Sequence, residues 1–315
     1  MNSPARPIAS PSTPIPSVVE RLADLRRQAQ RLRYPGPTPQ LPSRQSILAL
    51  ADDICRVIFP RHLGSRDLSN IDLDGYVGQV LERALPLLER EIALELSLPN
   101  RGEEAIAAHG DAAQIAANFI EALPRVRQLA DFDVRAALAA DPTLGSFDEV
   151  VFCSASVAAL LRHRLAHELY SLGAPLTAKI IAADLRGRAG IDIHPGAEID
   201  QGFSIVNAAG LTIGETAVIG KNVRVYAPVT LGESFAIGPD PEFGAENVIA
   251  FSGARAHGSS VEPVRRHPRI EDDVVIEAGA SLFGPITIGR GSTIGRNAWL
   301  LRDVPPYSCI ATEEV

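Results

Sequence analysis

The chain has 315 residues, of which 46% are hydrophobic and 22% charged, and its formal net charge is −8. This composition is typical of an ordinary soluble globular protein of about two domains. The negative charge argues against a dedicated nucleic-acid binder, which carries a basic domain or stripe. No apolar stretch reaches the roughly 18 residues that span a bilayer, and the N-terminus lacks the apolar core of a secretory signal. The three cysteines are far apart and form no CxxC pair, so we expect a cytoplasmic protein with reduced thiols.

The segment 1–45 is dense in proline. Such a composition does not sustain a packed core, and we expect a disordered tail. One run inside it, from Val18 to Arg33, places Leu22, Leu25 and Leu32 on one helical face. This run predicts a short, solvated helix.

Residues 46–188 have the spacing of helices. Apolar side chains recur three and four residues apart at Leu81, Leu85, Leu88, Ile92 and Leu96. Residues 111–123 and 157–172 repeat this pattern, which is that of helices with one buried face. Gly173 and Pro175 end one helix and begin the next. We therefore predict an α-helical domain over 46–188.

A period of six residues dominates the C-terminal third. Thirteen aliphatic residues carry it, at Ile193, Ile199, Ile205, Ile213, Ile219, Val225, Leu231, Ile270, Ile276, Leu282, Ile288, Ile294 and Leu300. A helix repeats near 3.6 residues and a simple strand at two, so this period fits neither. It predicts a parallel β-helix whose short strands each turn one aliphatic side chain inward, with stacked coils burying what one coil cannot. We place this domain at 189–308, with a short C-terminal tail at 309–315.

The six-residue pattern fails between Leu231 and Ile270. Loops of this length inside a regular repeat are uncommon and usually functional or disordered. We predict that segment 232–269 is a loop that protrudes from the β-helix.

Several sequence words lie between residues 137 and 306. They are Asp141-Pro142, Ala166-His167-Glu168-Leu169-Tyr170, Gly190-Ile191-Asp192-Ile193-His194-Pro195-Gly196-Ala197, Ile213-Gly214-Glu215-Thr216-Ala217-Val218-Ile219-Gly220, Arg266-His267-Pro268 and Asp303-Val304-Pro305-Pro306. Together with the helical domain and the six-residue repeat, they make the chain resemble serine O-acetyltransferases, especially the longer bacterial forms. The resemblance implies an α + β protein with a left-handed β-helix. It also implies acetyl transfer from acetyl-CoA to the hydroxyl of L-serine, giving O-acetylserine for cysteine biosynthesis.

The same resemblance implies a homo-oligomer, either a trimer or a dimer of trimers, with active sites between neighbouring β-helices. Many relatives also have a tail that enters cysteine synthase. The tail at 312–315 is short and acidic, although it ends in the β-branched Val315. It therefore does not favour a cysteine synthase complex.

Several site residues follow from the resemblance, position by position. Asp192 matches the acid that supports the catalytic base, and Asp141 matches a substrate-contacting acid from the helical domain. Arg266 and His267 match the pair that binds the substrate's carboxylate, a role that suits a fork-shaped guanidinium. A solvated basic cluster with Arg265 is the alternative explanation.

The acetyl-CoA site implied by the resemblance includes Gly232, Ala278, Gly279 and Arg296. Arg296 shares a six-residue phase with Arg290 and Arg302. These arginines either meet the anionic 3′-phospho-ADP end of CoA or form a solvated face.

The position of the catalytic base departs from the family pattern. The family's hydrophobic residue, Asp and His fall on Ile205, Val206 and Asn207, and an Asn amide has no basic lone pair at neutral pH. Three explanations remain open. Another group supplies the base, with His257 the first candidate and His267 the next; the acceptor is different, for example an amine; or the chain is a non-catalytic relative that binds CoA, an amino acid or a partner.

His163 and His167, four residues apart on a predicted helix, resemble a pair of metal ligands. No third ligand is evident, so the pattern favours helix packing, and we predict no metal site.

Overall fold

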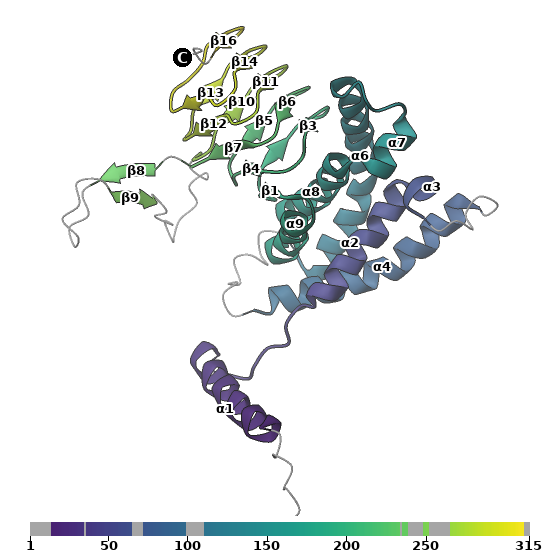
Figure 1. The fold of residues 1–315 in the computed structure, drawn as a ribbon. Helices are drawn as coiled ribbons and strands as arrows, with labels where there is room; N and C mark the ends of the chain where they lie inside the picture. Colours follow the sequence, from purple (N-terminus) through teal and green to yellow (C-terminus); the bar gives the residue numbers. More distant parts are fainter. Residues whose placement is uncertain are drawn as a thin grey trace, which may run out of the picture.

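The computed structural model describes residues 14–34, 36–64, 72–98, 110–233, 235–238, 248–251 and 265–311. Helices fill the first part of the chain, and a coiled stack of short strands fills the second (Figure 1). Within the described ranges, no helix has the length and apolar character needed to cross a membrane. Residues 1–13 of the predicted tail, His257 and Val315 lie outside the described residues.

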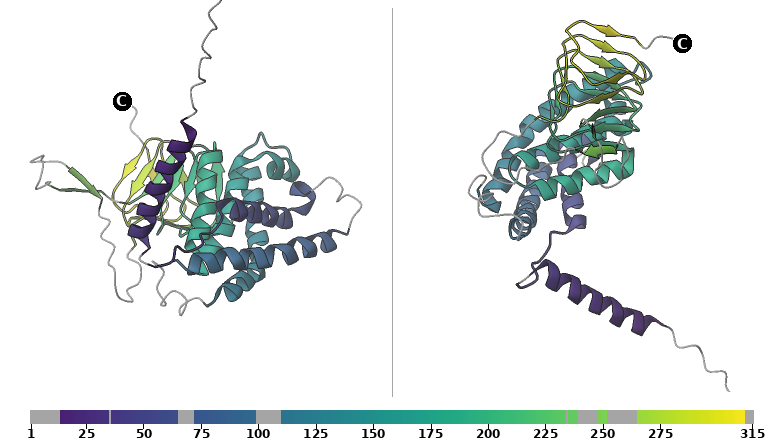
Figure 2. Two further views of the ribbon diagram at one scale, coloured as in Figure 1. Left: turned by 90° about the horizontal axis from the view of Figure 1, so that it is seen from below. Right: turned by 90° about the vertical axis from the view of Figure 1, so that its left-hand side faces the viewer.

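The predicted helix in the proline-rich segment is present as α1 (Ile15–Arg33). It begins three residues earlier than expected, because Pro16 fits the first turn of a helix, where its missing N–H is not needed. In this fully described helix no residue is buried. The right-hand view of Figure 2 shows it apart from the other helices.

The helical domain is confirmed in its described parts. Its helices are α2 (Arg44–Ile58), α3 (Pro60–Leu63), α4 (Leu73–Leu96), α6 (Ala112–Ala140), α7 (Phe147–Cys153), α8 (Ala155–Ser171) and α9 (Pro175–Ala189). Ser43, Asp111, Ser146 and Ser154 cap four of them by accepting a backbone N–H, which satisfies donors that a helix leaves free. The apolar faces of α2, α4, α6 and α8 share one core.

Three parallel sheets form the faces of the β-helix. The first contains β1 (Ile191–Ile193), β4 (Leu211–Ile213), β7 (Val229–Gly232), β12 (Ser281–Phe283) and β15 (Trp299–Leu300). The second contains β2 (Glu198–Ile199), β5 (Val218–Ile219), β10 (Arg269–Ile270) and β13 (Thr287–Ile288). The third contains β3 (Ser204–Val206), β6 (Arg224–Tyr226), β11 (Val275–Ile276), β14 (Thr293–Ile294) and β16 (Cys309–Ile310).

The six-residue period is the interior of this stack. Twelve of the thirteen aliphatic residues are buried, and the last, Leu300, is partly buried against the same core. Equivalent positions align across coils, as with Ile219 beside Ile270. The step from Ile205 to Ile213 is eight residues rather than six, because the turn between β3 and β4 is two residues longer than the equivalent turn between β6 and β7.

Two short parts of the predicted loop, 235–238 and 248–251, are described between the coils. An antiparallel pair, β8 (Phe235–Gly238) and β9 (Val248–Phe251), lies between β7 and β10 in the sequence. It stands away from the coils in Figure 1. The stack nevertheless resumes in register after it, since β10 pairs directly with β5.

Buried contacts join the helical domain to the first coil. Arg164 of α8 donates to the backbone carbonyls of Ile199 and Asp200. Nδ1 of His167 lies 2.9 Å from the carbonyl of Pro195. The side chains that α8 presents to the β-helix are therefore held in a fixed position.

Candidate functional site

Each coil has two edges beside the first sheet. Strands of that sheet begin at one edge, which we call the Asn207 edge, with Asn207, Ala278, Gly279 and Arg296 in its turns. They end at the other, the Arg266 edge, which contains His194, Glu215, Glu233, Arg266 and His267. The two edges lie on opposite sides of the first sheet.

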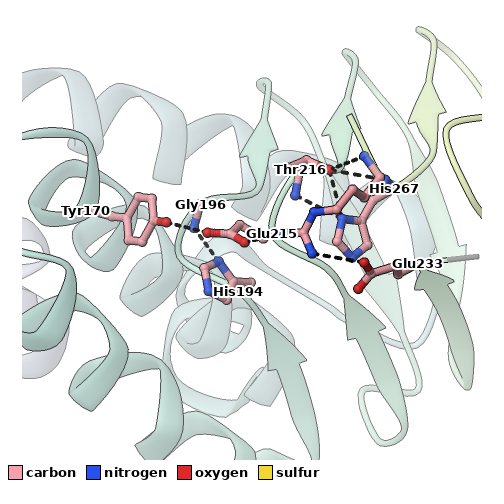
Figure 3. Close-up of polar contacts among 8 residues, drawn as sticks. Tyr170, His194, Gly196, Glu215, Thr216, Glu233 and His267 are labelled. Carbon is pink, nitrogen blue, oxygen red and sulfur yellow. Dashed lines mark hydrogen bonds and ion pairs between the residues drawn. The ribbon is translucent and has the colours of Figure 1, made fainter. Parts of the chain in front are cut away.

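Thr216 fixes the backbone of the Arg266 edge (Figure 3). Its hydroxyl oxygen accepts the backbone N–H of Arg266 at 2.8 Å and that of His267 at 3.1 Å. The hydroxyl proton is then left to point toward Nδ1 of His267, 2.9 Å away. The turn therefore holds both residues of the predicted carboxylate-binding pair.

The contacts of His267 make its ring a hydrogen-bond donor. Nδ1 faces both the hydroxyl and the backbone N–H of Thr216, so the proton of the neutral ring belongs on Nε2. Burial, and then the charge of Arg266, lower the pKa of His267. A neutral imidazole with its proton on Nε2 can donate a hydrogen bond from that atom but is poorly arranged to accept a proton.

Arg266 is paired with two carboxylates of its own chain. Its Nη2 lies 2.6 Å from Oε2 of Glu215, and its Nη1 lies 3.0 Å from Oε1 of Glu233. Burial lowers the pKa of Arg266, but hydrogen bonds and charges from the two glutamates outweigh this and raise it. The guanidinium is therefore held inside a network rather than left as a solvated cation.

Glu215 is the centre of this network (Figure 3). Besides Arg266, it accepts the hydroxyl of Tyr170 from α8 at 2.6 Å. Burial raises the pKa of Glu215, but the Tyr170 hydrogen bond and the nearby charges outweigh it, so that the pKa is lowered. The carboxylate is thus kept ionised beside Arg266.

His194 lies beside the same network. Its Nδ1 accepts the backbone N–H of Gly196 at 3.0 Å, and its ring meets that of Tyr170 edge to face at 5.4 Å. Burial lowers its pKa against the opposing charge of Glu215. His194 is therefore a second neutral ring whose proton belongs on Nε2.

Asn207 is exposed at the opposite edge, with a positive φ of 57°. Asn tolerates this left-handed conformation better than most residues. The turn that it begins ends at Gly210, whose N–H donates to the carbonyl of Gly190 at 2.8 Å. The base position thus belongs to a well-formed turn, but its side chain is an amide.

The predicted acetyl-CoA residues divide between the two edges. Gly279, with a φ of 84°, donates to the carbonyl of Pro228 at 2.6 Å, and Ala278 precedes it in the same turn. Arg296 lies one coil further along the Asn207 edge, 3.8 Å from Glu277. Gly232 instead ends β7 at the Arg266 edge, where Phe283 covers it.

Two predicted acids lie away from both edges. Asp192 is in the middle of β1 and is ion-paired with Arg186 at 2.8 Å. Asp141 follows α6, where its carboxylate accepts the backbone N–H and hydroxyl of Thr143 at 2.9 and 2.6 Å. Those two hydrogen bonds lower the pKa of Asp141. In one chain the predicted catalytic and substrate-binding residues therefore do not form one cluster.

Sequence reasoning missed four residues of the network around Arg266. Tyr170, Glu215 and Thr216 belong to words that carried the family resemblance, but no role was predicted for any of them. Glu233 belongs to none of these words, and the sequence offers no signal for it.

The described residues contain no group of three or more His, Cys, Asp or Glu side chains placed to hold a metal. His163 is fully buried, and its pKa is lowered well below the usual range, first by burial and then by its cationic and His neighbours. Its ring packs 5.9 Å from that of His167.

The fold and these two edges define a β-helical protein with a helical N-terminal domain. The plasmid serine acetyltransferase of Synechococcus elongatus is 42% identical over 283 residues, covering 87% of this chain and 83% of the relative. The serine acetyltransferase of Mycobacterium tuberculosis is 40% identical over 178 residues, covering 56% and 67%. The chain therefore belongs to the serine acetyltransferase family. No family model matches the sequence.

Solved structures agree with this assignment. Entamoeba histolytica serine acetyltransferase 1 in complex with L-cysteine has a TM-score of 0.67 at 25% identity, covering 86% of this chain and 87% of that one. Neisseria gonorrhoeae serine acetyltransferase in complex with serine has a TM-score of 0.51 at 25% identity, covering 84% and 95%. The predicted left-handed parallel β-helix is confirmed.

Proposed function

We propose that this chain transfers the acetyl group of acetyl-CoA to the hydroxyl of L-serine, giving O-acetylserine and CoA. The observation that carries the proposal is the Arg266 and His267 pair, which Thr216 holds in place at one edge of the stack. A guanidinium and an Nε2–H are donors suited to an amino-acid substrate. Relatives solved with serine and with L-cysteine support a small amino acid as ligand.

Assembly into a homotrimer would complete the site. The Asn207 edge carries the base position and most of the predicted acetyl-CoA residues, and the Arg266 edge carries the predicted acceptor residues. The first sheet separates the edges within one chain. Packing of the Asn207 edge of one protomer against the Arg266 edge of the next would bring the base position and the acetyl-CoA residues next to the acceptor residues. This holds for a trimer and for a dimer of trimers.

The proposed chemistry is a direct attack of the serine Oγ on the thioester carbonyl carbon. The Oγ–H proton leaves, the new C–O bond forms, the C–S bond breaks, and the CoA sulfur takes up a proton. A positioned base helps the first step because a neutral hydroxyl is a poor nucleophile. Backbone N–H groups at the turns would stabilise the oxyanion.

The base is the unusual part of this proposal. Asn207 is unable to accept the proton, and the rings of His194 and His267 each have Nδ1 occupied by a donor. His257 is the remaining candidate from the sequence. Without any base, the rate would fall by about 10²- to 10⁴-fold, leaving weak turnover from positioning alone.

A second candidate function is ligand binding without turnover. Val206 and Asn207 favour it, because both replace residues that the family uses on serine. Such a protein would bind CoA or an amino acid, or would assemble with a catalytic relative.

The deciding experiment measures CoA release from acetyl-CoA with L-serine for the native chain, His257→Ala and Asn207→His. Native turnover that His257→Ala abolishes supports the enzyme with a relocated base. Turnover restored only by Asn207→His supports an intact pocket that lacks its base. Acetyl-CoA binding without turnover in all three proteins supports the second candidate.

A further inference from the structure

The second carboxylate on Arg266 points to a control of acceptor binding. We propose that Glu233 is an internal competitor that occupies the carboxylate site of Arg266 and weakens binding of the amino-acid acceptor. This inference rests on the proposed function, because it takes Arg266 to be the group that binds the acceptor's carboxylate.

The geometry of Arg266 leaves little room for an incoming carboxylate. A bidentate carboxylate needs two adjacent N–H groups of the guanidinium fork. Nη2 already donates to Glu215 at 2.6 Å, and Nη1 donates to Glu233 at 3.0 Å. A guanidinium has five N–H donors, and the two glutamates take one on each terminal nitrogen. An acceptor carboxylate that binds both terminal nitrogens therefore competes with Glu215 and Glu233.

Glu233 is the carboxylate that can move. Glu215 has a second donor in Tyr170, which holds it against α8. Among the described residues, the carboxylate of Glu233 accepts a hydrogen bond only from Arg266. Glu233 also follows the last residue of β7, where the chain leaves the regular coil. Its side chain can swing away without breaking a strand pairing.

Charge adds to this competition. Glu233 places a second negative charge beside the guanidinium that Glu215 already pairs (Figure 3). The carboxylate of an incoming acceptor is repelled by that charge until Glu233 moves away. Neutralising Glu233 should therefore tighten binding of any ligand that uses its carboxylate, and should not help a ligand that lacks one.

The test measures dissociation constants on the full-length protein without CoA, by ligand-observed NMR. The probes are L-serine, L-alanine, which keeps the carboxylate but lacks the hydroxyl, and serinol, which lacks the carboxylate. We expect Glu233→Gln to bind L-serine and L-alanine about three- to tenfold more tightly than the native chain. Serinol binding should not improve.

Asp53→Asn is the matched control, since it removes a carboxylate from Arg56 in the helical domain and should change none of the three constants. A thermal melt shows that each variant is folded. Glu233→Ala, which removes both charge and hydrogen bond, should act in the same direction as Glu233→Gln.

Unchanged or weaker L-alanine binding in both Glu233 variants overturns the inference, as does an equal gain for serinol. The absence of measurable L-alanine binding to every protein also overturns it, because Arg266 then offers no carboxylate site. If the Glu233 variants bind both amino acids more tightly but neither they nor the native chain release CoA from acetyl-CoA, the inference is supported and the proposed function is contradicted.

Discussion

Asp133 of α6 and Arg164 of α8 form two parallel hydrogen bonds of 3.0 Å each. Both side chains are almost fully buried, at 1% and 4% exposed. The same guanidinium also donates to carbonyls of the first coil. One buried cation therefore joins two helices to the β-helix.

Replacing Asp133 by Ala should strongly destabilise the fold, because it leaves the charge of Arg164 buried and unpaired. Loss of one partner of a buried ion pair lowers the free energy of unfolding by about 3–5 kcal/mol. Urea denaturation measures the change. Asp53→Asn, which breaks an ion pair exposed by 41% and 43%, should change it by less than about 1 kcal/mol. Equal effects of the two substitutions would contradict the role given to Asp133.

Gly214 should be essential for the position of His267. A Cβ at Gly214 would lie 2.0 Å from the imidazole of His267, so Gly214→Ala must push the ring out of place. We expect weaker L-serine binding and unchanged acetyl-CoA binding, measured by titration calorimetry. Gly187→Ala is the control, because nothing lies within 4 Å of its added Cβ, and Ala is the better helix former.

Thr216→Val should weaken acceptor binding by another route. Val fills the same space but accepts no hydrogen bond, so the backbone N–H groups of Arg266 and His267 lose their partner. We expect the KM for L-serine to rise by about tenfold, or about 1.4 kcal/mol, because the loss of these two hydrogen bonds loosens the turn that holds the pair. Thr212→Val, on the exposed face of β4, should leave KM unchanged. If turnover is absent, the dissociation constant of L-serine replaces KM.

Stability should fall on mild acidification because of His163. Burial depresses its folded pKa well below 6.5, so the unfolded chain binds a proton first as pH drops. The stabilisation is therefore complete above about pH 6.5 and decreases below it, by up to about 1.4 kcal/mol per pH unit for one group. Urea denaturation between pH 7.5 and 5.5 measures this slope. His163→Gln should reduce it by about one proton, and an unchanged slope would assign the effect to His194 and His267 instead.

The β-helix could be predicted from sequence because its signal is local and repeated. Every coil turns aliphatic residues such as Ile193 inward. Burial of these residues sets the register between successive strands, in which Ile193 pairs with Ile213 and Ile213 with Leu231. The helical domain could be predicted for the same reason, because the spacing of its apolar residues is also local and repeated. The start of helix α1 was predicted to within three residues, because the helical spacing of its leucines can be recognised between the flanking prolines.

The Arg266 edge could be predicted only in part. The resemblance indicated Arg266 and His267, but the contact from Arg266 to Glu233 spans 33 residues and the whole protruding segment. The contact from Tyr170 to Glu215 joins different domains. Neither follows from periodicity, because a repeat determines which side chains point inward and says nothing of outward neighbours. Whether Asp192, Asn207 and Asp141 act on substrate stays a prediction.

The insertion between β7 and β10 has a consequence for how this protein can vary. Its two ends meet at one turn of the stack, where Glu233 and Arg266 touch, while β5 and β10 pair as though nothing intervened. Doubling the length of such an inserted loop raises the entropic free-energy cost of closing it by only about 0.6 kcal/mol. The segment can therefore change in length or in sequence while the coils stay in register, and every such change begins and ends beside Arg266.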